Sequence, residues 1–341
     1  MIKIAINGFG RIGRTTLRRL IDAYPGKLQL VAVNDLTDKA NIVYLLKYDT
    51  VYKTFNGFLK ETEKGFLVGR TEKDAQEVIV TAERDPRNLK WGELGVDIVI
   101  EATGFFANKA GAQLHLDAGA KKVIISAPGG NDVKTIVYNV NHTDLTKDDK
   151  IISAASCTTN SIAPLVAFMD KEFGIEVGKL TTVHAYTGNQ AIVDAPAKKD
   201  MRRGRAGAQN IIPSSTGAAK AIGLVVKNVS GFLDGAALRV PVVAGSVSDL
   251  TLVLKTKGLT AEKINETMKK YSNESFGYNE DQIVSSDILG STYGAILDAT
   301  LTKVNHGRDG HELVTVAAWY DNEMSFVSQL VRLIIHVAEL S

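Results

Sequence analysis

Short apolar runs alternate with longer, mixed stretches along the first half of the chain. The runs at residues 2–7 and 28–34 enclose a segment from Arg11 to Tyr24 with helical spacing, which stops at Pro25-Gly26. Further strand-length runs occur at residues 77–81, 97–101, 122–126, 135–138 and 150–153. This alternation predicts an α/β fold in which helices flank a mostly parallel, doubly wound sheet.

The last segment, residues 323–340, has a different pattern. Its apolar side chains recur every three or four positions, at Phe326, Val327, Leu330, Val331, Ile334 and Ile335. Such spacing predicts an amphipathic helix. The length of 341 residues suggests two domains.

Composition narrows the class of protein. Hydrophobic residues make up 45% and charged residues 23%, which is ordinary globular usage. The formal net charge of +2 gives no electrostatic reason to expect a nucleic-acid or membrane partner. The chain enters a strand without a charged leader and carries one cysteine, so we expect no signal peptide and a cytoplasmic location. No apolar run is long enough to predict a transmembrane helix.

A glycine-rich turn follows the first predicted strand. The string Gly8-Phe9-Gly10-Arg11-Ile12-Gly13 is a complete G-x-G-x-x-G, and Asp35 ends the second strand. A strand before the turn, a helix after it and an acidic residue farther on form the dinucleotide-binding fingerprint. Asp35 would accept from a ribose 2′-hydroxyl and repel a 2′-phosphate, so the pattern predicts NAD rather than NADP.

Two further strand ends could extend this pocket. Thr103 lies in Glu101-Ala102-Thr103-Gly104, and Ser126 begins Ser126-Ala127-Pro128-Gly129. Cofactors lie against the carboxyl ends of strands in doubly wound sheets. Plain loop residues are the alternative for both segments.

The only cysteine, Cys157, stands between an apolar strand-like run and a helical one, in Ala155-Ser156-Cys157-Thr158-Thr159-Asn160. A single thiol cannot form an internal disulfide. The start of a helix favours an anion, so we expect a lowered thiol pKa and a nucleophilic thiolate. A buried thiol without chemistry is the alternative.

A nucleophilic cysteine needs a base, and His184 is the best candidate. It ends the β-branched run Leu180-Thr181-Thr182-Val183-His184. A structural histidine is the alternative reading of this residue. The remaining histidines lie in helical or polar loop contexts without comparable surroundings, and no spacing predicts a metal site: His115, His142, His306, His311 and His336.

Three segments suit anions. The string Ser214-Ser215-Thr216-Gly217 opens a predicted helix, where hydroxyl and N–H groups could hold phosphate or simply cap the helix. Arg239 lies inside an apolar strand and needs either a structural carboxylate or a bound phosphate. Residues 198–205 form a basic cluster that could be a solvated loop or attract small anions.

Taken together, these motifs resemble those of phosphorylating glyceraldehyde-3-phosphate dehydrogenases. The similarity covers nearly the whole chain and is carried by several ordered strings, which are Asn7 to Arg14, Leu46-Lys47-Tyr48-Asp49-Thr50, Ala82-Glu83-Arg84-Asp85-Pro86, Ser156-Cys157-Thr158-Thr159-Asn160, His184-Ala185-Tyr186-Thr187, Ser215-Thr216-Gly217-Ala218-Ala219-Lys220 and Trp319-Tyr320-Asp321-Asn322-Glu323.

The resemblance implies roles for particular residues. Cys157 would be the nucleophile and His184 the base. Thr187 and Arg239 would hold the phosphate of glyceraldehyde 3-phosphate. Inorganic phosphate would be held by Ser156, Thr158, Thr216 and Gly217. NAD would be bound by Gly8, Gly10, Arg11, Ile12, Gly13, Asp35, Arg84, Thr103, Ser126 and Asn322.

It also implies an organisation. Residues 1–156 would form a Rossmann-type NAD-binding domain that the helix at 322–341 completes, and residues 157–321 an α+β catalytic domain. Family members are typically homotetramers in which a loop such as 186–212 reaches a neighbouring subunit. Alternatives left open are a related aldose-phosphate dehydrogenase acting on erythrose 4-phosphate, and a nucleotide-binding adhesin or thiol redox sensor.

Overall fold

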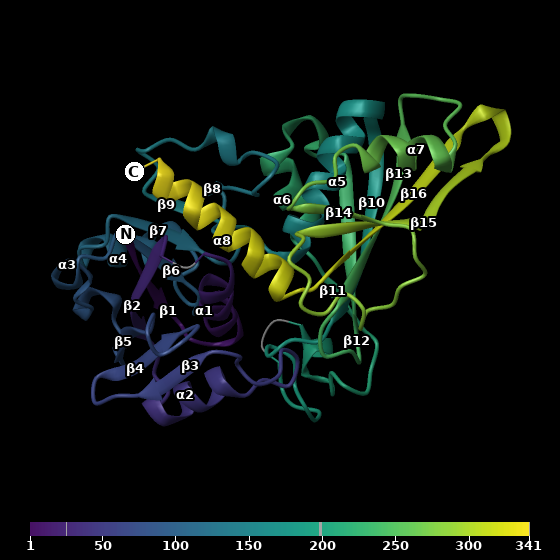
Figure 1. Cartoon of the computed structure of the whole chain (residues 1–341). Helices are drawn as coiled ribbons and strands as arrows, with labels where there is room; N and C mark the ends of the chain where they lie inside the picture. The colour runs from purple at the N-terminus through teal and green to yellow at the C-terminus, as the bar shows by residue number, and fades with distance from the viewer. Residues whose placement is uncertain (25, 198–199, 341) are drawn as a thin grey trace. The chain divides into compact units, whose positions relative to one another are not determined.

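The computed structural model describes residues 1–24, 26–197 and 200–340. The helix stop predicted at Pro25, and Lys198 and Lys199 of the basic cluster, lie outside this description. The chain divides into two compact units (Figure 1). One comprises Met1–Tyr138, His142–Ser156 and Leu330–Ser341, and the other Asn139–Asn141 and Cys157–Gln329.

The first unit is built on a sheet with nine described strands in the order β3-β4-β5-β2-β1-β6-β7-β9-β8. The strands are β1 Ile2–Asn7, β2 Leu28–Asn34, β3 Phe58–Glu61, β4 Gly65–Gly69, β5 Gln76–Thr81, β6 Ile98–Glu101, β7 Lys122–Ile125, β8 Lys134–Thr135 and β9 Ile151–Ser153. From β5 to β8 every neighbouring pair is parallel, which confirms the predicted Rossmann-type fold class.

Strand β1 is the centre of this sheet, with β2 on one side and β6 on the other. The connection after β1 leads to β2 on one side, and the chain later returns to β6 on the other side. The direction in which strands are added thus reverses at β1, which opens a crevice at the carboxyl ends of the strands. The helices of this part of the chain are α1 Arg11–Ala23, α2 Lys39–Lys47, α3 Trp91–Leu94 and α4 Lys109–Asp117, with 3-10 turns η1 Pro86–Asn88 and η2 His142–Asp144.

One predicted strand is wrong in extent. The apolar run at residues 135–138 forms a ladder only at β8, where Thr135 pairs with Ser153. Ile136 and Val137 are fully buried without belonging to a strand, and Asn139 turns the chain with a φ of 69°. Beyond β8 the run keeps one bond to β9, from the Ile136 N–H to the Ser153 carbonyl oxygen at 2.8 Å, and burial accounts for the rest. The other predicted strands agree with the structure to within one residue at each end.

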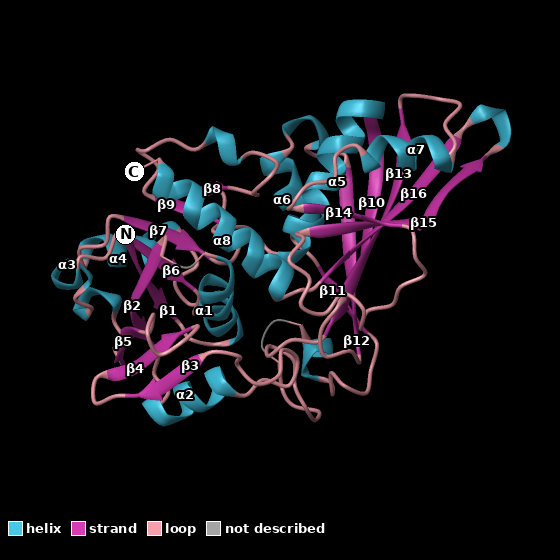
Figure 2. Ribbon diagram, viewed as in Figure 1, coloured by secondary structure: helices cyan, strands magenta, loops and turns pink. Residues whose placement is uncertain are grey.

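The second unit holds a mixed sheet of seven described strands in the order β11-β12-β10-β13-β16-β15-β14. The strands are β10 Ile175–Ala185, β11 Ile212–Ser215, β12 Leu233–Val240, β13 Ser246–Leu254, β14 Phe276–Asn279, β15 Ala295–His306 and β16 Glu312–Tyr320. Helices α5 Cys157–Phe173, α6 Ala218–Val225 and α7 Ala261–Lys269 pack against it (Figure 2). Short 3-10 turns are η3 Met201–Gly204, η4 Lys227–Val229 and η5 Arg308–Gly310.

Helix α8, Met324–Glu339, forms the predicted C-terminal helix. Its apolar side chains are buried, as amphipathic spacing requires: Phe326, Val327, Leu330, Val331, Ile334 and Val337. Among the helices described, none is long and apolar enough to cross a membrane.

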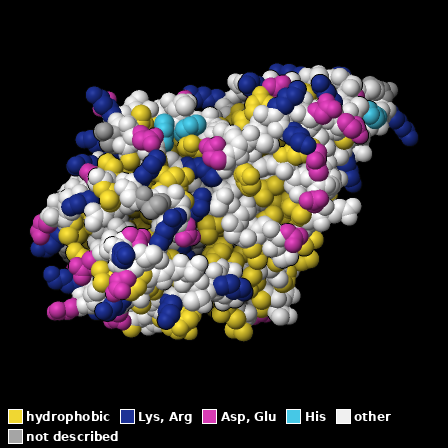
Figure 3. Space-filling model, viewed as in Figure 1, with side chains coloured by type: hydrophobic (Ala, Val, Ile, Leu, Met, Phe, Trp, Pro, Cys, Tyr) yellow, Lys and Arg dark blue, Asp and Glu magenta, His cyan; other side chains and the backbone are white. Residues whose placement is uncertain are grey.

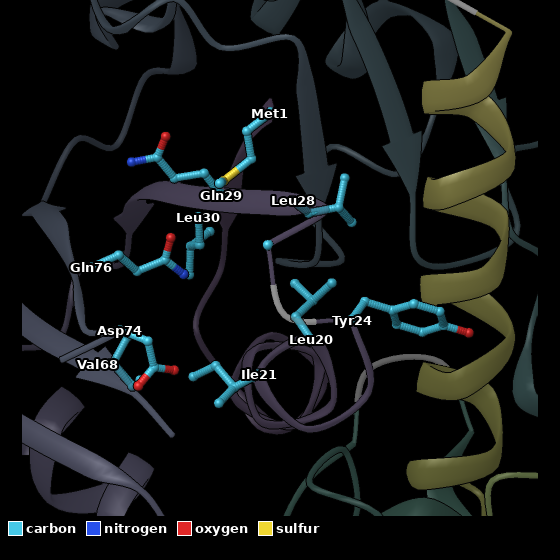
Figure 4. Close-up of a pocket in the computed structure, with 12 residues that line it drawn as sticks. Met1, Leu20, Ile21, Tyr24, Leu28, Gln29, Leu30, Val68, Asp74 and Gln76 are labelled. Atoms are coloured by element: carbon cyan, nitrogen blue, oxygen red, sulfur yellow. The ribbon is translucent and has the colours of Figure 1, made fainter. Parts of the chain in front are cut away.

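A small cavity of about 330 Å³ lies where β1 and β2 begin (Figure 4). Its apolar wall comes from the last turn of α1 and from β2, through Leu20, Ile21, Leu28 and Leu30. The cavity is at the opposite end of the strands from the glycine-rich turn, so it is not the crevice that the dinucleotide fingerprint predicts.

Candidate active site

A cavity of about 670 Å³ opens at the carboxyl ends of β1, β2 and β6. It is lined by Asn7, Gly8, Gly10, Asn34, Asp35, Leu36, Glu83, Arg84, Ala102, Thr103, Phe105 and Phe106. Five residues that the sequence assigned to cofactor binding therefore share one cavity: Gly8, Gly10, Asp35, Arg84 and Thr103.

The three fingerprint glycines differ in what surrounds them. Gly8 has a φ of +92°, and a Cβ there would stand 2.6 Å from the backbone nitrogen of Thr103. A Cβ on Gly13 would meet the Gly8 carbonyl oxygen at 2.4 Å. A Cβ on Gly10 would meet nothing within 4 Å, although Gly10 lines the cavity. Gly8 and Gly13 are thus required by packing, whereas Gly10 keeps space open for a ligand.

Asp35 and the start of α1 supply the polar contacts that a dinucleotide needs. One carboxylate oxygen of Asp35 accepts from the backbone N–H of Phe9 at 2.7 Å, and the other from Thr37 at 2.9 Å. These bonds fix the carboxylate at the cavity wall, where it can accept from a ribose hydroxyl. Helix α1 has no capping side chain and no acidic residue in its first turn, so its N-terminus attracts phosphate. The residues present therefore fit NAD.

Two predicted cofactor residues are placed differently. The Arg11 guanidinium forms an ion pair with Asp49 and lies 5.6 Å from the ring centroid of Tyr52. The Arg11 side chain is therefore engaged within the protein, and cofactor binding through the backbone of Arg11 and Ile12 stays a prediction. Ser126 donates to the Glu101 carbonyl oxygen at 3.0 Å and lies outside the cavity lining.

In the second unit, Cys157 begins helix α5 and His184 lies near the end of β10. The Cys157 sulfur is 3.3 Å from Nε2 of His184. His184 is 3% exposed, and its ring meets the Tyr320 ring edge-on at a centroid distance of 5.9 Å. The two residues are 27 positions apart in sequence, and the fold places them within proton-transfer distance.

The other ring nitrogen of His184 determines the tautomer. Nδ1 lies 2.7 Å from the Ala185 carbonyl oxygen and 2.9 Å from Nη1 of Arg239. A guanidinium only donates and a carbonyl only accepts, so one Nδ1 atom cannot satisfy both. We assign the hydrogen to Nδ1, donating along the shorter contact to Ala185. Nε2 then presents a lone pair to the thiol, as a general base must.

Burial dominates the protonation of this pair. It raises the pKa of the Cys157 thiol, and the nearby Arg239 charge opposes that rise. Burial, and then Arg239, lower the pKa of His184 to about 4. The expectation of a lowered thiol pKa is therefore wrong, because desolvation of the sulfur outweighs the effect of the helix terminus. Both shifts favour the neutral forms, a thiol beside an imidazole.

Arg239 lies on β12 as the register partner of His184 on β10. Its Nη1 donates to the Ala185 carbonyl at 3.0 Å and to the Thr187 hydroxyl at 3.3 Å. Its buried Nε has no hydrogen-bond partner, and within the described residues no carboxylate pairs with it. Of the two partners that the sequence left open, the structure supplies no carboxylate, so an anionic ligand is favoured.

Similarity to known proteins decides the family. Profiles of the glyceraldehyde 3-phosphate dehydrogenase NAD binding domain and C-terminal domain match residues 2–109 and 156–322. Proteins named glyceraldehyde-3-phosphate dehydrogenase from Clostridium pasteurianum and Clostridium acetobutylicum are 54% and 53% identical over the full length of both chains. One from Lactococcus lactis is 52% identical over 100% of this chain and 99% of its own. The chain belongs to the glyceraldehyde 3-phosphate dehydrogenase family.

Family membership confirms the resemblance read from the sequence and the NAD-binding character of the first unit. The remaining predicted site residues lie beside the cysteine or at the start of α6. Thr158 is buried, with its hydroxyl 4.0 Å from the Cys157 sulfur, and Ser156 directly precedes Cys157. Thr216 accepts from the Ala218 N–H at 3.1 Å, and Gly217 caps α6 without a side-chain bond. A Cβ on Gly217 would meet nothing within 4 Å, which leaves this turn accessible to an anion.

Asn322 lies just before α8. Its amide oxygen accepts from the Gly245 N–H at 3.1 Å and lies 3.4 Å from the Ser246 hydroxyl. No hydrogen bond involves its amide nitrogen among the residues described. The predicted contact of Asn322 with the nicotinamide stays a prediction.

Two residues near the cysteine were not singled out from the sequence. The Tyr320 hydroxyl is buried between the hydroxyls of Thr158 at 3.0 Å and Thr182 at 2.8 Å, and burial raises its pKa to about 12. Arg203, in the basic cluster, lowers the pKa of both His184 and Arg239. A tyrosine in an apolar strand and an arginine among other cations carry no distinguishing signal in one sequence.

Proposed function

We propose that this chain oxidises D-glyceraldehyde 3-phosphate to 1,3-bisphosphoglycerate, with NAD as cofactor and inorganic phosphate as second substrate. The observation that carries the proposal is the 3.3 Å approach of the Cys157 sulfur to His184 Nε2, beside Arg239, which pairs with no carboxylate in the described part of the chain. Family membership supports the same reaction.

The reaction begins with proton transfer. As the Cys157 sulfur attacks the aldehyde carbon, His184 Nε2 takes the thiol proton and a carbon–sulfur bond forms. The aldehyde oxygen is protonated by the same imidazolium, which gives a hemithioacetal. In the proposal the backbone N–H of Cys157 and the His184 ring stabilise negative charge on that oxygen.

Oxidation leaves a thioester on Cys157. When bound, NAD supplies the hydride acceptor of this step. His184 takes the hydroxyl proton of the hemithioacetal as the aldehyde hydrogen departs with its electron pair. Inorganic phosphate then attacks the thioester carbon, the carbon–sulfur bond breaks, and Cys157 recovers its proton from His184.

Anion binding divides between two groups of residues in the proposal. Arg239 and Thr187 hold the phosphate of the aldehyde, since Nη1 of Arg239 already lies 3.3 Å from the Thr187 hydroxyl. Ser156, Thr158, Thr216 and Gly217 hold the attacking phosphate, and Arg203 adds positive charge. The cofactor is held by the cavity residues Gly8, Gly10, Asp35, Arg84 and Thr103, by the backbone of Arg11 and Ile12, and by Ser126 and Asn322.

We also propose a homotetramer and a cytoplasmic location. The segment 186–212 exposes large apolar side chains, Ile192 at 88%, Met201 at 87% and Ile211 at 68%. Figure 3 shows apolar side chains gathered over the region of β11 and β12. A neighbouring copy covering this face would remove that apolar surface from water.

The proposed domains follow the sequence: residues 1–156 with the helix at 322–341 bind NAD, and residues 157–321 carry the chemistry. The two compact units support most of this division, with Leu330–Ser341 grouped with the first unit, but Asn139–Asn141 and residues 322–329 group with the second. No specific observation on the described residues favours a nucleotide-binding adhesin or a thiol redox sensor.

The test is NADH formation from glyceraldehyde 3-phosphate by the full-length protein, with and without inorganic phosphate. We expect phosphate-dependent reduction of NAD that Cys157→Ser abolishes. Faster turnover of erythrose 4-phosphate would instead favour the related aldose-phosphate dehydrogenase. No turnover of either aldehyde by folded protein would overturn the proposal. Light scattering of the same sample tests the tetramer.

A further inference from the structure

A buried histidine and a buried glutamate lie behind the dinucleotide cavity, and the proposed reaction uses neither. His115 on α4 and Glu101 at the end of β6 are both fully inaccessible to solvent. His115 Nε2 lies 3.0 Å from one carboxylate oxygen of Glu101. A buried carboxylate is stable only when several donors surround it, so the identity of those donors matters.

A tryptophan sets the tautomer of His115. Trp91 Nε1 lies 3.1 Å from His115 Nδ1, and an indole N–H can only donate. Nδ1 therefore accepts, and the ring hydrogen resides on Nε2, from which it is donated to Glu101. Trp91 is itself fully buried in the core of the first unit. Packing of Trp91 in the core thus fixes the position of the imidazole and makes Nε2 the nitrogen that donates.

Glu101 forms hydrogen bonds with two residues of the cavity wall. One of its oxygens accepts from the backbone N–H of Thr103 at 2.8 Å and from the Thr103 hydroxyl. The other accepts from the side-chain amide of Asn7 at 2.6 Å, in addition to His115. Thr103 and Asn7 both line the dinucleotide cavity.

The bonds continue across the sheet. The Asn7 amide oxygen accepts from Asn34 Nδ2 at 2.8 Å, which joins the ends of β1 and β2. Asn34 then exchanges hydrogen bonds with the backbone of Glu83, accepting from its N–H and donating to its carbonyl, each at 2.8 Å. Asn34 and Glu83 also line the cavity. One buried chain of hydrogen bonds therefore spans the floor of the cavity from β6 to the segment after β5.

We propose that His115 is a positioning residue for the dinucleotide. Its Nε2–H orients the Glu101 carboxylate, which holds Thr103 and Asn7 in the geometry that the cofactor meets. The proposal rests on the proposed NAD-dependent function and adds a residue to it that has no contact with the cavity itself. A second link is steric, because the ring of Phe106, which lines the cavity, meets the His115 ring edge-on at 6.3 Å.

A purely structural role predicts something different. Removal of any buried group lowers stability, but only a positioning residue changes cofactor affinity more than equally destabilising core substitutions do. The chain offers matched variants. His115→Leu removes the donor, His115→Gln retains an N–H near the Nε2 position, and Val123→Ala opens a cavity in the same core without touching the hydrogen bonds.

The experiment measures NAD binding directly by titration calorimetry on each full-length variant, together with thermal unfolding. We expect His115→Leu to weaken NAD binding by about tenfold, as the loss of one hydrogen bond to a buried charge implies. His115→Gln should recover most of that affinity. Val123→Ala should lower the unfolding temperature. It should leave the NAD dissociation constant within about twofold of the unsubstituted value, because Val123 makes none of the hydrogen bonds that reach the cavity.

Unchanged NAD affinity in His115→Leu, or an equal loss in Val123→Ala, would overturn the positioning role. Nitrogen NMR of isotope-labelled histidine checks the tautomer independently, and a hydrogen on Nδ1 of His115 would also contradict the proposal. Failure of the proposed function is distinguishable, since it would appear as absence of NAD binding or aldehyde oxidation in the unsubstituted protein.

Discussion

Arg239 and His184 are register partners on the parallel strands β12 and β10, with Nη1 of the arginine 2.9 Å from Nδ1 of the histidine. A fixed positive charge therefore lies beside the histidine that contacts the only cysteine. The charge opposes protonation of His184 and favours the thiolate of Cys157. One arginine thus biases both partners of the proton transfer while it remains available to an anionic substrate.

Replacement of His184 tests the base directly. We expect His184→Gln to lower the rate of NADH formation by about 10²–10⁴-fold, the usual contribution of a positioned general base. The measurement is initial velocity at saturating substrates. His311→Gln, an exposed histidine on the same unit, serves as the control and should retain full activity. A loss of less than tenfold in His184→Gln would contradict the assignment.

Arg239→Leu should raise the pKa of both Cys157 and His184, because the arginine charge lowers each of them. The pH profile of iodoacetamide alkylation at Cys157 should move to higher pH. The KM for glyceraldehyde 3-phosphate should rise as well, since its phosphate loses its cation. The control is Arg202→Leu, which deletes an exposed positive charge of the same unit. It should leave the pH profile of alkylation unchanged. A profile shifted to lower pH in Arg239→Leu would refute the electrostatic argument.

The depressed pKa of His184 predicts a pH-dependent stability. In the folded protein the pKa is about 4, against an ordinary 6.5 in the unfolded chain. Between these values the unfolded state binds more protons, so stability is complete above pH 6.5 and falls as the pH drops toward 4. The loss from this residue is on the order of 3 kcal/mol. The measurement is urea unfolding at several pH values across this range. The free energy of unfolding should change less with pH in His184→Gln than in the unsubstituted protein.

Tyr320→Phe removes a hydroxyl that lies between Thr158 and Thr182. Two buried threonine hydroxyls then lose a partner, so we expect a loss of about 1–3 kcal/mol in the free energy of unfolding. Urea denaturation measures this loss. Tyr271→Phe, at a tyrosine bonded to Glu172 near the surface, is the control and should cost less. Equal losses in the two variants would show that the buried position of the Tyr320 hydroxyl is unimportant.

Alanine substitution should affect NAD binding at Gly10 and stability at Gly13. Gly10→Ala should fold normally but weaken NAD binding, because its Cβ enters empty space in the cavity. Gly13→Ala should destabilise the first unit, since its Cβ would stand 2.4 Å from the Gly8 carbonyl oxygen. Thermal unfolding and NAD calorimetry on both variants separate the two effects. Full NAD affinity in Gly10→Ala would show that the dinucleotide does not approach this backbone.

Much of the site could be predicted because its signals are local. The glycine-rich turn, Asp35 and the surroundings of Cys157 follow from short strings whose backbone requirements are independent of distant residues. The lone Arg239 in an apolar strand was recognisable because a buried guanidinium needs an anion wherever it lies. Periodicity likewise gave most strands of the first unit, but β3 and β4 were not predicted, and at residues 135–138 the apolar run extends past the two-residue strand β8.

Other features required distances that no single sequence contains. His115 was set aside as an ordinary helical histidine, yet the fold brings it between Trp91 and Glu101. Tyr320 acquires its neighbours from β10 and α5, more than a hundred residues away. The thiol pKa was predicted in the wrong direction because the helix start is visible in sequence, whereas the burial of the sulfur is not.

The sequence by itself determined most strands of the first unit, the dinucleotide turn and the family, and it singled out Cys157, since each depends on local backbone chemistry or on the order of motifs. Only the tertiary structure decided which nitrogen of His184 faces the sulfur, that no carboxylate among the described residues pairs with Arg239, and that burial governs the protonation of the pair. Hydrogen-bond geometry and desolvation arise from residues far apart in the chain, and they exist only once the strands have paired.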